Sequence, residues 1–414
     1  MPLTLAPRRP RRGRARLALA AGLALVATAL TAPAASAETD DFYTPPRGVG
    51  GKPGTVLKSE PTTFYLDPTR LVKAPARAQR LMYVSRSADG DPTAVTGTLL
   101  RSRKTWWGPG RRPLVSFAVG TQGMADRCAP SRQLEAGTEY EGQFINGYLT
   151  RGYDVVVSDY EGLGTPGTHR YVNTIALGRN VLDAARAAKN LPDDAVADRA
   201  RVYVAGYSEG GNAAGGALQE QPTYAPEMRL RGGYAGAVPA ELARVAPMLD
   251  GSPYAAFLLY SVAALDAEYP ELGIRDLLNE RGRTLVDASE GTCTFDAVAR
   301  FAGTRSETLT KSGQPITAFL SRPDIAAVLE ELRVGRVRPE VPVLMTHTTL
   351  DDVVQYRQAR DAAGRWCDLG ARVKFSSGVA PTHIGGAVES YPKAFGWLEA
   401  RIAGLPAPSS CWRL

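Results

Sequence analysis

The sequence contains few of the side chains that hold metal ions. Only three histidines and four cysteines occur among its 414 residues. The cysteine spacing does not fit a zinc site, and the three histidines stand far apart in the chain. The sequence also lacks heptads, internal repeats and long low-complexity segments. It therefore predicts no metal centre, and it is not typical of a coiled coil or a repeat protein.

No apolar run is long enough to predict a transmembrane segment. The run over residues 17–30 is too short to span a bilayer, and it follows six arginines within the first 16 residues. Ala35-Ser36-Ala37 then provides an A-x-A cleavage site, so residues 1–37 are predicted to be a secretory signal peptide. We expect a secreted, extracellular protein.

The removal of residues 1–37 also changes the net charge of the protein and the partners that this charge indicates. It takes away six of the 49 basic residues and none of the 42 acidic ones, which leaves a net charge of +1 in place of +7. A basic protein directed at nucleic acid is no longer indicated. An exported chain with an even number of cysteines predicts two disulfides, with three possible pairings among Cys128, Cys293, Cys367 and Cys411.

Apolar runs and helical periodicity alternate along the chain. Residues 38–75 are rich in proline and glycine and are expected to form an N-terminal arm with little regular structure. The predicted strands are 80–85, 93–100, 114–119, 154–158, 202–205, 230–238, 341–346 and 372–376, and the predicted helices include 175–191 and 392–402. Such alternation favours an α/β fold with a mostly parallel central sheet.

Residues 239–338 interrupt this alternation, because they lack clear strands and have the pattern of several helices. We expect a helical cap inserted into a core formed by residues 38–238 and 339–414. The strongly apolar segment 254–265 fits a buried helix of that cap. It fits equally a lid whose apolar face meets lipid or lines a pocket for an acyl chain.

The segment 201–216 carries the clearest functional signal. Its first residues have the composition of a short strand, Gly206-Tyr207-Ser208-Glu209-Gly210 fits G-x-S-x-G, and small residues follow. A strand, a sharp turn and a tightly packed helix are typical of a nucleophile elbow, in which strain exposes the serine hydroxyl. Ser208 is the candidate nucleophile. The alternative is a glycine-rich turn with an incidental serine.

A serine nucleophile needs a base and a group that orients the base. In this type of fold the chain order is Ser, acid, His, so only His347 and His383 can be the base. His347 follows the strand 341–346 directly, and choosing it would move the acid into the cap. We favour His383, in a flexible loop after the last strand. The alternative for His383 is a histidine of a surface loop.

Asp351 and Asp352 lie between Ser208 and His383 in the chain, and either carboxylate can orient the base. We favour Asp351, with Asp352 as a solvated neighbour or a helix cap. The oxyanion hole requires two N–H donors. One is expected from Glu209, which follows the nucleophile. The other is expected from the glycine-containing loop 120–123, and we choose Thr121.

Residues 162–167 match G-x-G-x-x-G after a strand. A dinucleotide-binding fingerprint should open a helix directly, whereas Pro166 and a further loop delay the helix here. We therefore expect no nucleotide site. The loop is predicted to pack beside the mouth of the active site, with His169 on its far side.

Several segments resemble the secretory lipase family, the α/β-hydrolases related to yeast-type lipase A. They are DFYTPP (41–46), GTVLKSE (54–60), GTQG (120–123), CAPS (128–131), GYDVVVSDYEGLG (152–164) and the elbow. The resemblance implies an α/β-hydrolase fold with a helical cap and ester hydrolysis without a cofactor. It assigns the nucleophile, acid and base to Ser208, Asp351 and His383.

The resemblance also implies a Cys128–Cys293 disulfide that ties the cap to the core, which leaves Cys367 to pair with Cys411. Two positions depart from the family pattern: Val119 stands where histidine is often found, and Glu209 where glutamine is frequent. Both lie beside the expected oxyanion hole, so they bear on substrate preference and pH optimum.

The combined prediction is a secreted serine hydrolase of lipid catabolism, a triacylglycerol lipase or carboxylesterase. Its partners would be small-molecule or lipid esters, with transient contact with a lipid interface. Two alternatives remain open. The same triad can serve acyl transfer or peptide cleavage, and a degenerate site would leave a non-catalytic, lipid-binding scaffold.

Overall fold

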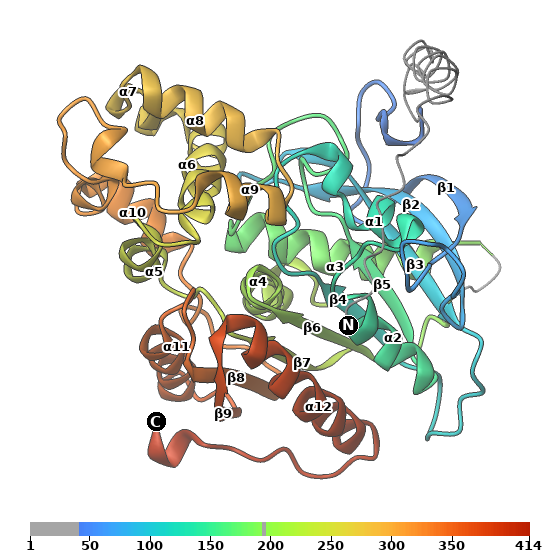
Figure 1. Cartoon of the computed structure of the whole chain (residues 1–414). Helices are drawn as coiled ribbons and strands as arrows, with labels where there is room; N and C mark the ends of the chain where they lie inside the picture. Colours follow the sequence, from blue (N-terminus) through green and yellow to red (C-terminus); the bar gives the residue numbers. More distant parts are fainter. Residues whose placement is uncertain (1–40, 193–195) are drawn as a thin grey trace, which may run out of the picture. The chain divides into compact units, whose positions relative to one another are not determined.

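The computed structural model describes residues 41–192 and 196–414, so the predicted signal peptide lies outside the described residues. Nine strands in these ranges form one sheet with the order β1-β2-β3-β5-β4-β6-β7-β8-β9 (Figure 1). The strands are β1 Val56–Thr62, β2 Ala76–Arg86, β3 Pro92–Ser102, β4 Leu114–Ala118, β5 Asp154–Ser158, β6 Val202–Tyr207, β7 Leu230–Gly236, β8 Val343–Leu350 and β9 Val373–Pro381.

The sheet is mostly parallel, as predicted. Strands β1, β2, β3 and β5 pair antiparallel in that order, whereas β5, β4, β6, β7, β8 and β9 run parallel to one another. Every residue of β4, β5 and β6 is buried. Continuous apolar runs of this kind arise where helices cover both faces of a parallel sheet.

The helices of the core are α1 Pro130–Ala136, α2 Gly142–Thr150, α3 Thr174–Asn190, α4 Glu209–Tyr224, α11 Tyr356–Asp368 and α12 Thr382–Ile402. Neighbouring residues of β4 show which helices lie on which face. Ser116 donates a hydrogen bond to Val181 of α3, whereas the ring of Phe117 packs against Tyr148 of α2 and Tyr391 of α12. Because successive side chains of a strand point to opposite faces, α3 lies on one face and α2 and α12 lie on the other.

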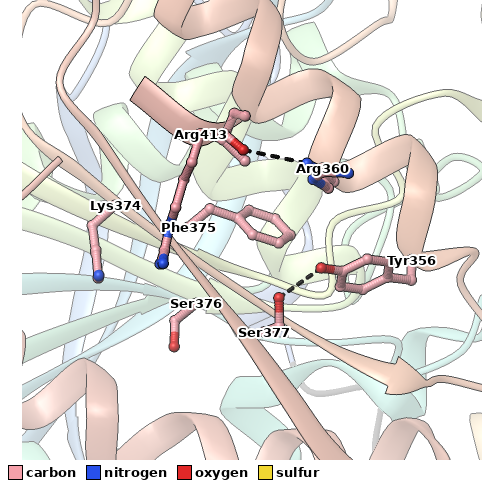
Figure 2. Close-up of a pocket in the computed structure, with 8 residues that line it drawn as sticks. Tyr356, Arg360, Lys374, Phe375, Ser376, Ser377 and Arg413 are labelled. Atoms are coloured by element: carbon pink, nitrogen blue, oxygen red, sulfur yellow. Dashed lines mark hydrogen bonds between the residues drawn. The ribbon is translucent and has the colours of Figure 1, made fainter. Parts of the chain in front are cut away.

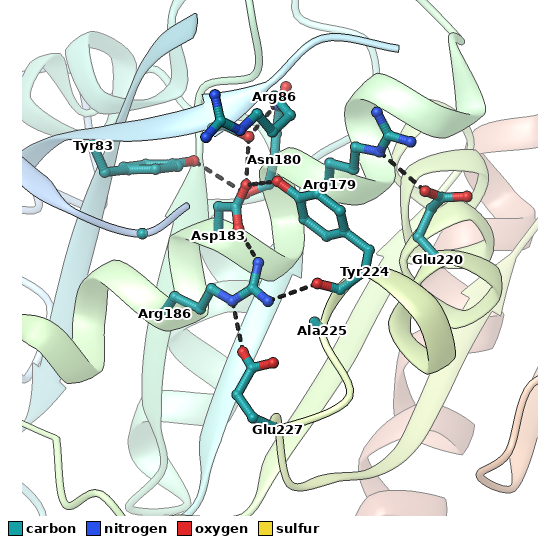
Figure 3. A network of polar contacts seen from close by, with 12 residues as sticks. Tyr83, Arg86, Arg179, Asn180, Asp183, Arg186, Glu220, Tyr224, Ala225 and Glu227 are labelled. Atoms are coloured by element: carbon teal, nitrogen blue, oxygen red, sulfur yellow. Dashed lines mark hydrogen bonds and ion pairs between the residues drawn. The ribbon is translucent and has the colours of Figure 1, made fainter. Parts of the chain in front are cut away.

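A buried polar network fixes α3 against its neighbours (Figure 3). The carboxylate of Asp183 accepts hydrogen bonds from Ser85 of β2, from Tyr224 at the end of α4 and from Arg186, each at 2.7 Å. Burial raises the pKa of Asp183, and the three donors partly offset this shift. The network therefore joins the helix before the elbow strand to the helix after the elbow.

The helical insertion between β7 and β8 has an apolar cluster of its own. Its helices are α5 Leu242–Leu249, α6 Ala255–Glu268, α7 Ile274–Leu277, α8 Glu280–Glu290, α9 Thr294–Phe301 and α10 Pro323–Glu331. The apolar segment expected at 254–265 forms most of α6 and is largely buried. No helix among the described residues is long and apolar enough to cross a membrane.

Two disulfides are present, and both have the pairing that the family resemblance implied. Cys128, in the loop region after β4, is bonded to Cys293 at the start of α9. Cys367, in α11, is bonded to Cys411 near the C-terminus. The first disulfide joins the insertion to the core, and the second fastens the C-terminal tail.

The structure corrects two predictions of secondary structure. The expected arm 38–75 contains β1, an edge strand that pairs on one side only and therefore tolerates Pro61 and a weak apolar pattern. Helix α12 begins at Thr382 rather than near residue 392. Gly385, Gly386 and Pro392 lower the helix propensity of this segment, but tertiary packing overrides it. His383 therefore lies in the first turn of a helix and not in a flexible loop.

Candidate active site

The turn between β6 and α4 holds Ser208 in a strained conformation. Its φ is 62° and its ψ is −123°, a region that residues other than glycine seldom adopt. A Cβ atom on Gly206 would lie 2.1 Å from the carbonyl oxygen of Gly210, and one on Gly210 would lie 2.1 Å from that of Ala118. The glycines of G-x-S-x-G are required because backbone packs against backbone here. The turn leaves Ser208 half-buried at the end of the strand.

The structure brings His383 and Asp351 together. The Nδ1 atom of His383 lies 2.8 Å from Oδ2 of Asp351, and the Asp351 side chain is fully buried. The hydroxyl of Tyr207 donates a hydrogen bond of 2.8 Å to the carbonyl oxygen of His383, and the two rings are in contact. Because Tyr207 directly precedes Ser208, these contacts tie the first turn of α12 to the end of the strand that leads to Ser208.

The other ring nitrogen of His383 has no partner within residues 41–192 and 196–414. Nε2 is buried and makes no hydrogen bond there, and the whole residue is 6% exposed. Since Nδ1 faces a carboxylate, it carries the proton, and Nε2 is a free acceptor. An imidazole in this state can take a proton from a hydroxyl group.

Asp351 is held by four donors. Its Oδ1 accepts the N–H groups of Val353 and Val354 at 2.9 and 2.8 Å. Its Oδ2 faces His383 and also Nε2 of His347, at 3.2 Å. Burial alone would raise the pKa of Asp351, but the attraction of His383 and the bonds from both histidines bring it well below its usual value. Asp351 is therefore an anion under ordinary conditions.

The contact of His347 with Asp351 was missed by the sequence reasoning, which treated His347 only as a rival base. His347 is fully buried, and its Nε2 also lies 2.9 Å from the carbonyl oxygen of Val354. Two acceptors at one nitrogen place the proton on Nε2. The spacing of four residues between His347 and Asp351, just past a predicted strand, offered a signal for this contact.

Asp352 has a different environment from its neighbour. Its Oδ1 accepts the backbone N–H of His383 at 2.8 Å, and its Oδ2 accepts the hydroxyl of Tyr254 at 3.0 Å. Asp352 thus caps the first turn of α12 and contacts the insertion, which agrees with its predicted role as a helix cap. It does not orient the imidazole ring.

Glu209 and Thr121 lie in the elements from which oxyanion donors were expected. Glu209 is the first residue of α4, so its N–H has no acceptor within that helix. Thr121 lies in the loop after β4 and is 5% exposed. Its hydroxyl contacts that of Tyr171 at 3.1 Å, and its carbonyl accepts Tyr140 and Thr294 at 3.1 and 2.6 Å. These contacts leave the N–H of Thr121 available.

The loop 120–123 is fastened to the helical insertion by main-chain bonds. Thr294 N donates to Gln122 O, and Met124 N donates to Thr292 O, each at 3.0 Å. Gly123 pairs with Cys293 as an isolated antiparallel bridge, and the disulfide closes the same contact. The candidate oxyanion loop and the entrance to α9 therefore form one structural unit.

Two buried glutamates support the same loop from the core side, and the sequence reasoning singled out neither. Glu141 accepts the N–H of Gly120 and the hydroxyl of Tyr391, an α12 residue, the latter at 2.9 Å. Glu139 accepts Gln122 Nε2 at 3.1 Å and the N–H of Glu141 at 3.0 Å. Burial is the main cause that raises the pKa of Glu139 to about 7 and that of Glu141 to about 8. The charge of Asp159 adds to the first shift, and the charge of Glu139 adds to the second.

His169 was predicted to lie on the far side of the loop 162–167, and this prediction is wrong. Its Nε2 lies 2.7 Å from Oε1 of Glu209, directly behind the elbow, and both side chains are 1% exposed. The loop folds back because Gly162 has a φ of 70° and stands close to the backbone at Thr168. No sequence pattern joins residues 40 positions apart.

A polar hollow of about 450 Å³ lies between β9, α11 and the C-terminal tail (Figure 2). Tyr356 and Ser377 share a hydrogen bond of 2.6 Å there, and Arg360 donates to the carbonyl of Arg413. The residues that line this hollow include none of the candidate site residues. This hollow is therefore not part of the candidate active site.

One known protein family matches most of this chain. The Secretory lipase family matches residues 129–410, more than half of the chain. The chain belongs to this family. Membership confirms the resemblance drawn from the motifs and the prediction of a secreted, extracellular protein. It also establishes the general class of activity, a hydrolase of the lipase and esterase group.

Curated relatives are similar over most of their length. A secreted triacylglycerol lipase of Malassezia restricta is 29% identical over 388 residues, which cover 89% of this chain and 80% of the relative. A probable inactive lipase of Mycobacterium tuberculosis is 29% identical over 382 residues, which cover 89% of this chain and 82% of that protein. Overall similarity therefore does not separate active from inactive members, and the site itself must be tested.

Solved structures confirm the α/β-hydrolase fold. Lipase A of Candida antarctica superposes with a TM-score of 0.79 at 23% identity, covering 90% of this chain and 87% of that one. The rice cell wall degrading esterase of Xanthomonas oryzae superposes with a TM-score of 0.68 at 18% identity, covering 86% and 97%. At these identities the likeness concerns the fold.

The substitution Glu141→Gln should reduce the loss of stability at rising pH. The folded-state pKa values of Glu139 and Glu141, about 7 and about 8, exceed the ordinary value of 4.5. The folded state thus binds more protons than the unfolded state between pH 4.5 and 8, and stability falls as pH rises through this window. Urea unfolding from pH 4.5 to 8.5 should show a shallower decline for the variant than for the wild type.

The exposed residue Glu340 provides the matched control, because Glu340→Gln removes a carboxylate that stays in water. This variant should follow the wild-type curve. Equal slopes for Glu141→Gln and the wild type would contradict the assignment of a proton to the buried pair.

Proposed function

We propose that the protein is a secreted serine carboxylic-ester hydrolase that cleaves acylglycerols and related lipid esters through an acyl-enzyme on Ser208. One observation carries the proposal: near the strained elbow of Ser208, the His383–Asp351 pair presents a buried Nε2 that has no partner among the described residues. The names of the lipase relatives support the substrate class.

In the acylation step, Oγ of Ser208 attacks the ester carbonyl carbon while Nε2 of His383 takes the hydroxyl proton. Asp351 holds the ring through Nδ1–H and stabilises the imidazolium that forms. The tetrahedral intermediate then collapses as His383 donates the proton to the leaving alcohol. Ser208 remains as an ester of the fatty acid.

In the deacylation step, a water molecule replaces the alcohol. His383 takes a proton from the water as its oxygen attacks the acyl carbon, and then returns the proton to Ser208 as the fatty acid leaves. In both steps the N–H groups of Glu209 and Thr121 are proposed to stabilise the oxyanion. Such donors, fixed in place before the reaction, are effective in a site that excludes water.

The helical insertion, with the predicted bounds 239–338, is proposed to act as a cap over this site. Its α6 packs on Tyr171 through Phe257 and Tyr260, and its Tyr254 bonds to Asp352. The apolar cluster of the insertion includes Met124 and Val354 from the core. An apolar cap placed in this way favours acyl chains over polar substrates. Residues 1–37 are proposed to be removed on export.

Hydrolysis of p-nitrophenyl esters from acetate to palmitate tests the proposed function. The wild type should release p-nitrophenol, and Ser208→Ala should lower kcat roughly a thousandfold or more while the protein still folds. Circular dichroism checks the fold of the variant. Wild-type turnover that persists in Ser208→Ala would refute the acyl-enzyme, and no turnover at any chain length would favour a non-catalytic protein.

The neighbouring carboxylates provide a matched pair for the assignment of the acid. Asp351→Asn should lower kcat about 10³- to 10⁴-fold, because an amide can no longer fix the required tautomer of His383. Asp352→Asn should lower it less than about tenfold, since asparagine also accepts the N–H that Asp352 caps, and such a cap contributes about 1 kcal/mol. Equal losses in the two variants would contradict the separate roles.

Four exposed apolar side chains belong to the segments that carry Asp351 and His383. Leu350, Val379, Ile384 and Val388 are each more than half exposed, and they lie at the ends of β8 and β9 and on the first turns of α12. Ile384 directly follows His383. We propose that these four residues, here called the rim patch, contact the surface of a lipid aggregate while the substrate enters the site.

The substitution Ile384→Glu should separate activity on lipid aggregates from activity on dissolved esters. An isoleucine side chain contributes ~1.5–3 kcal/mol on burial, so hydrolysis of emulsified triolein should fall roughly tenfold or more, while hydrolysis of p-nitrophenyl acetate should change little.

Leu405→Glu provides the control for the rim patch, because Leu405 is equally exposed but lies beyond the far end of α12. It should leave both activities unchanged. A parallel loss on both substrates in Ile384→Glu would mean that the residue supports the site rather than the lipid contact.

A further inference from the structure

Behind the elbow lies an ionisable pair that the catalytic steps above do not use. Nε2 of His169 is 2.7 Å from Oε1 of Glu209, and each side chain is 1% exposed. His169 also stacks on the ring of Tyr160, with centroids 5.8 Å apart. The pair is therefore buried, oriented and placed on the residue whose N–H is the candidate oxyanion donor.

Both ring nitrogens of His169 face acceptors. Its Nδ1 lies 3.2 Å from the carbonyl oxygen of Glu161, which can only accept, and its Nε2 faces the carboxylate of Glu209. A ring with a hydrogen on both nitrogens satisfies both acceptors, and its positive charge would compensate the negative charge of the carboxylate.

The pair also reaches the other candidate donor. The ring of Tyr171 packs edge-on against His169, with centroids 6.2 Å apart, and its hydroxyl lies 3.1 Å from that of Thr121. Burial raises the pKa of Tyr171, and an uncompensated negative charge on Glu209 would raise it further. A charge on Glu209 would thus be felt on both sides of the oxyanion hole.

An uncompensated carboxylate at this place would oppose catalysis. It would stand, shielded from water, on the residue that must stabilise a developing negative charge, where charges interact strongly. We propose that His169 is a positioning residue that neutralises the Glu209 side chain, so that the N–H of Glu209 can stabilise the oxyanion. This inference rests on the proposed function and names a residue outside the triad.

A double-mutant cycle tests the inference in the secreted protein. In His169→Gln, the amide N–H lies close to the place of Nε2, so a hydrogen bond survives but the compensating positive charge is lost. We expect kcat for p-nitrophenyl butyrate to fall about tenfold or more, with KM changed less than about twofold, because only the transition state carries the oxyanion. Glu209→Gln keeps the backbone N–H but removes the carboxylate, so it provides the second background of the cycle, and its own measured kcat is the reference in that background.

Rescue is the decisive result. The double variant His169→Gln/Glu209→Gln carries no carboxylate to neutralise, so its kcat should lie within about threefold of that of Glu209→Gln, whereas His169→Gln costs about tenfold or more in the wild-type background. A tenfold loss between Glu209→Gln and the double variant, or an unaffected His169→Gln, would each overturn the inference. Should His169→Gln fail to fold, the comparison of Glu209→Gln with the double variant still decides, since a tenfold difference between them overturns the inference.

A failure of this inference can be distinguished from a failure of the proposed function. If the wild type hydrolyses no ester, the proposed function fails and this inference fails with it. If the wild type is active and Ser208→Ala is not, but the double variant shows no rescue, only the role of His169 is refuted. Melting temperatures of all four proteins separate a loss of kcat from a loss of folded protein.

Discussion

The contact of backbone with backbone at the elbow is the constraint on which the rest of the site depends. Ser208 donates its N–H to the carbonyl of Gly236 at 3.0 Å, and the start of α4 lies so close to Ala118 that Gly210 has no room for a Cβ atom. The candidate nucleophile is thus set by three neighbouring parallel strands rather than by flexible side chains. Gly386 extends the same packing to α12, because a Cβ there would lie 2.5 Å from the hydroxyl of Tyr207. The helix that carries His383 is thereby fitted against the strand that leads to Ser208.

The sequence was sufficient for the parts of this arrangement that local patterns encode. G-x-S-x-G between an apolar run and small residues indicates an elbow, and the order of residues along the chain separates His383 from His347. The start of α12 was not predictable in this way, since its glycines lower helix propensity and are explained only by the close approach of Tyr207. The contact of His169 with Glu209 depends on how the loop 162–167 folds back, and no periodicity reports such a tertiary contact.

The site contains three kinds of buried carboxylate, and the neighbours of each determine its charge. Asp351 receives four donors and stays an anion. Glu139 and Glu141 stand close together with fewer donors, so protonation is favoured for them up to near-neutral pH. Glu209 faces a histidine ring nitrogen at 2.7 Å. A negative charge is therefore stabilised beside the candidate base, whereas the carboxylates around the candidate oxyanion loop and the start of α4 have neighbours that favour protonation or can compensate the charge.

The attachment of the insertion to the core adds to the contacts that hold the candidate oxyanion loop. Two main-chain hydrogen bonds, the bridge of Gly123 with Cys293 and the disulfide from Cys128 all join this loop to the entrance of α9. A displacement of α9 away from the core would have to break main-chain bonds and strain a covalent link. The opposite end of the insertion meets the site through side chains, with Tyr254 on Asp352 and the aromatic rings of α6 on Tyr171. The candidate oxyanion loop is therefore held by main-chain and covalent links that do not depend on how the side chains of α6 pack.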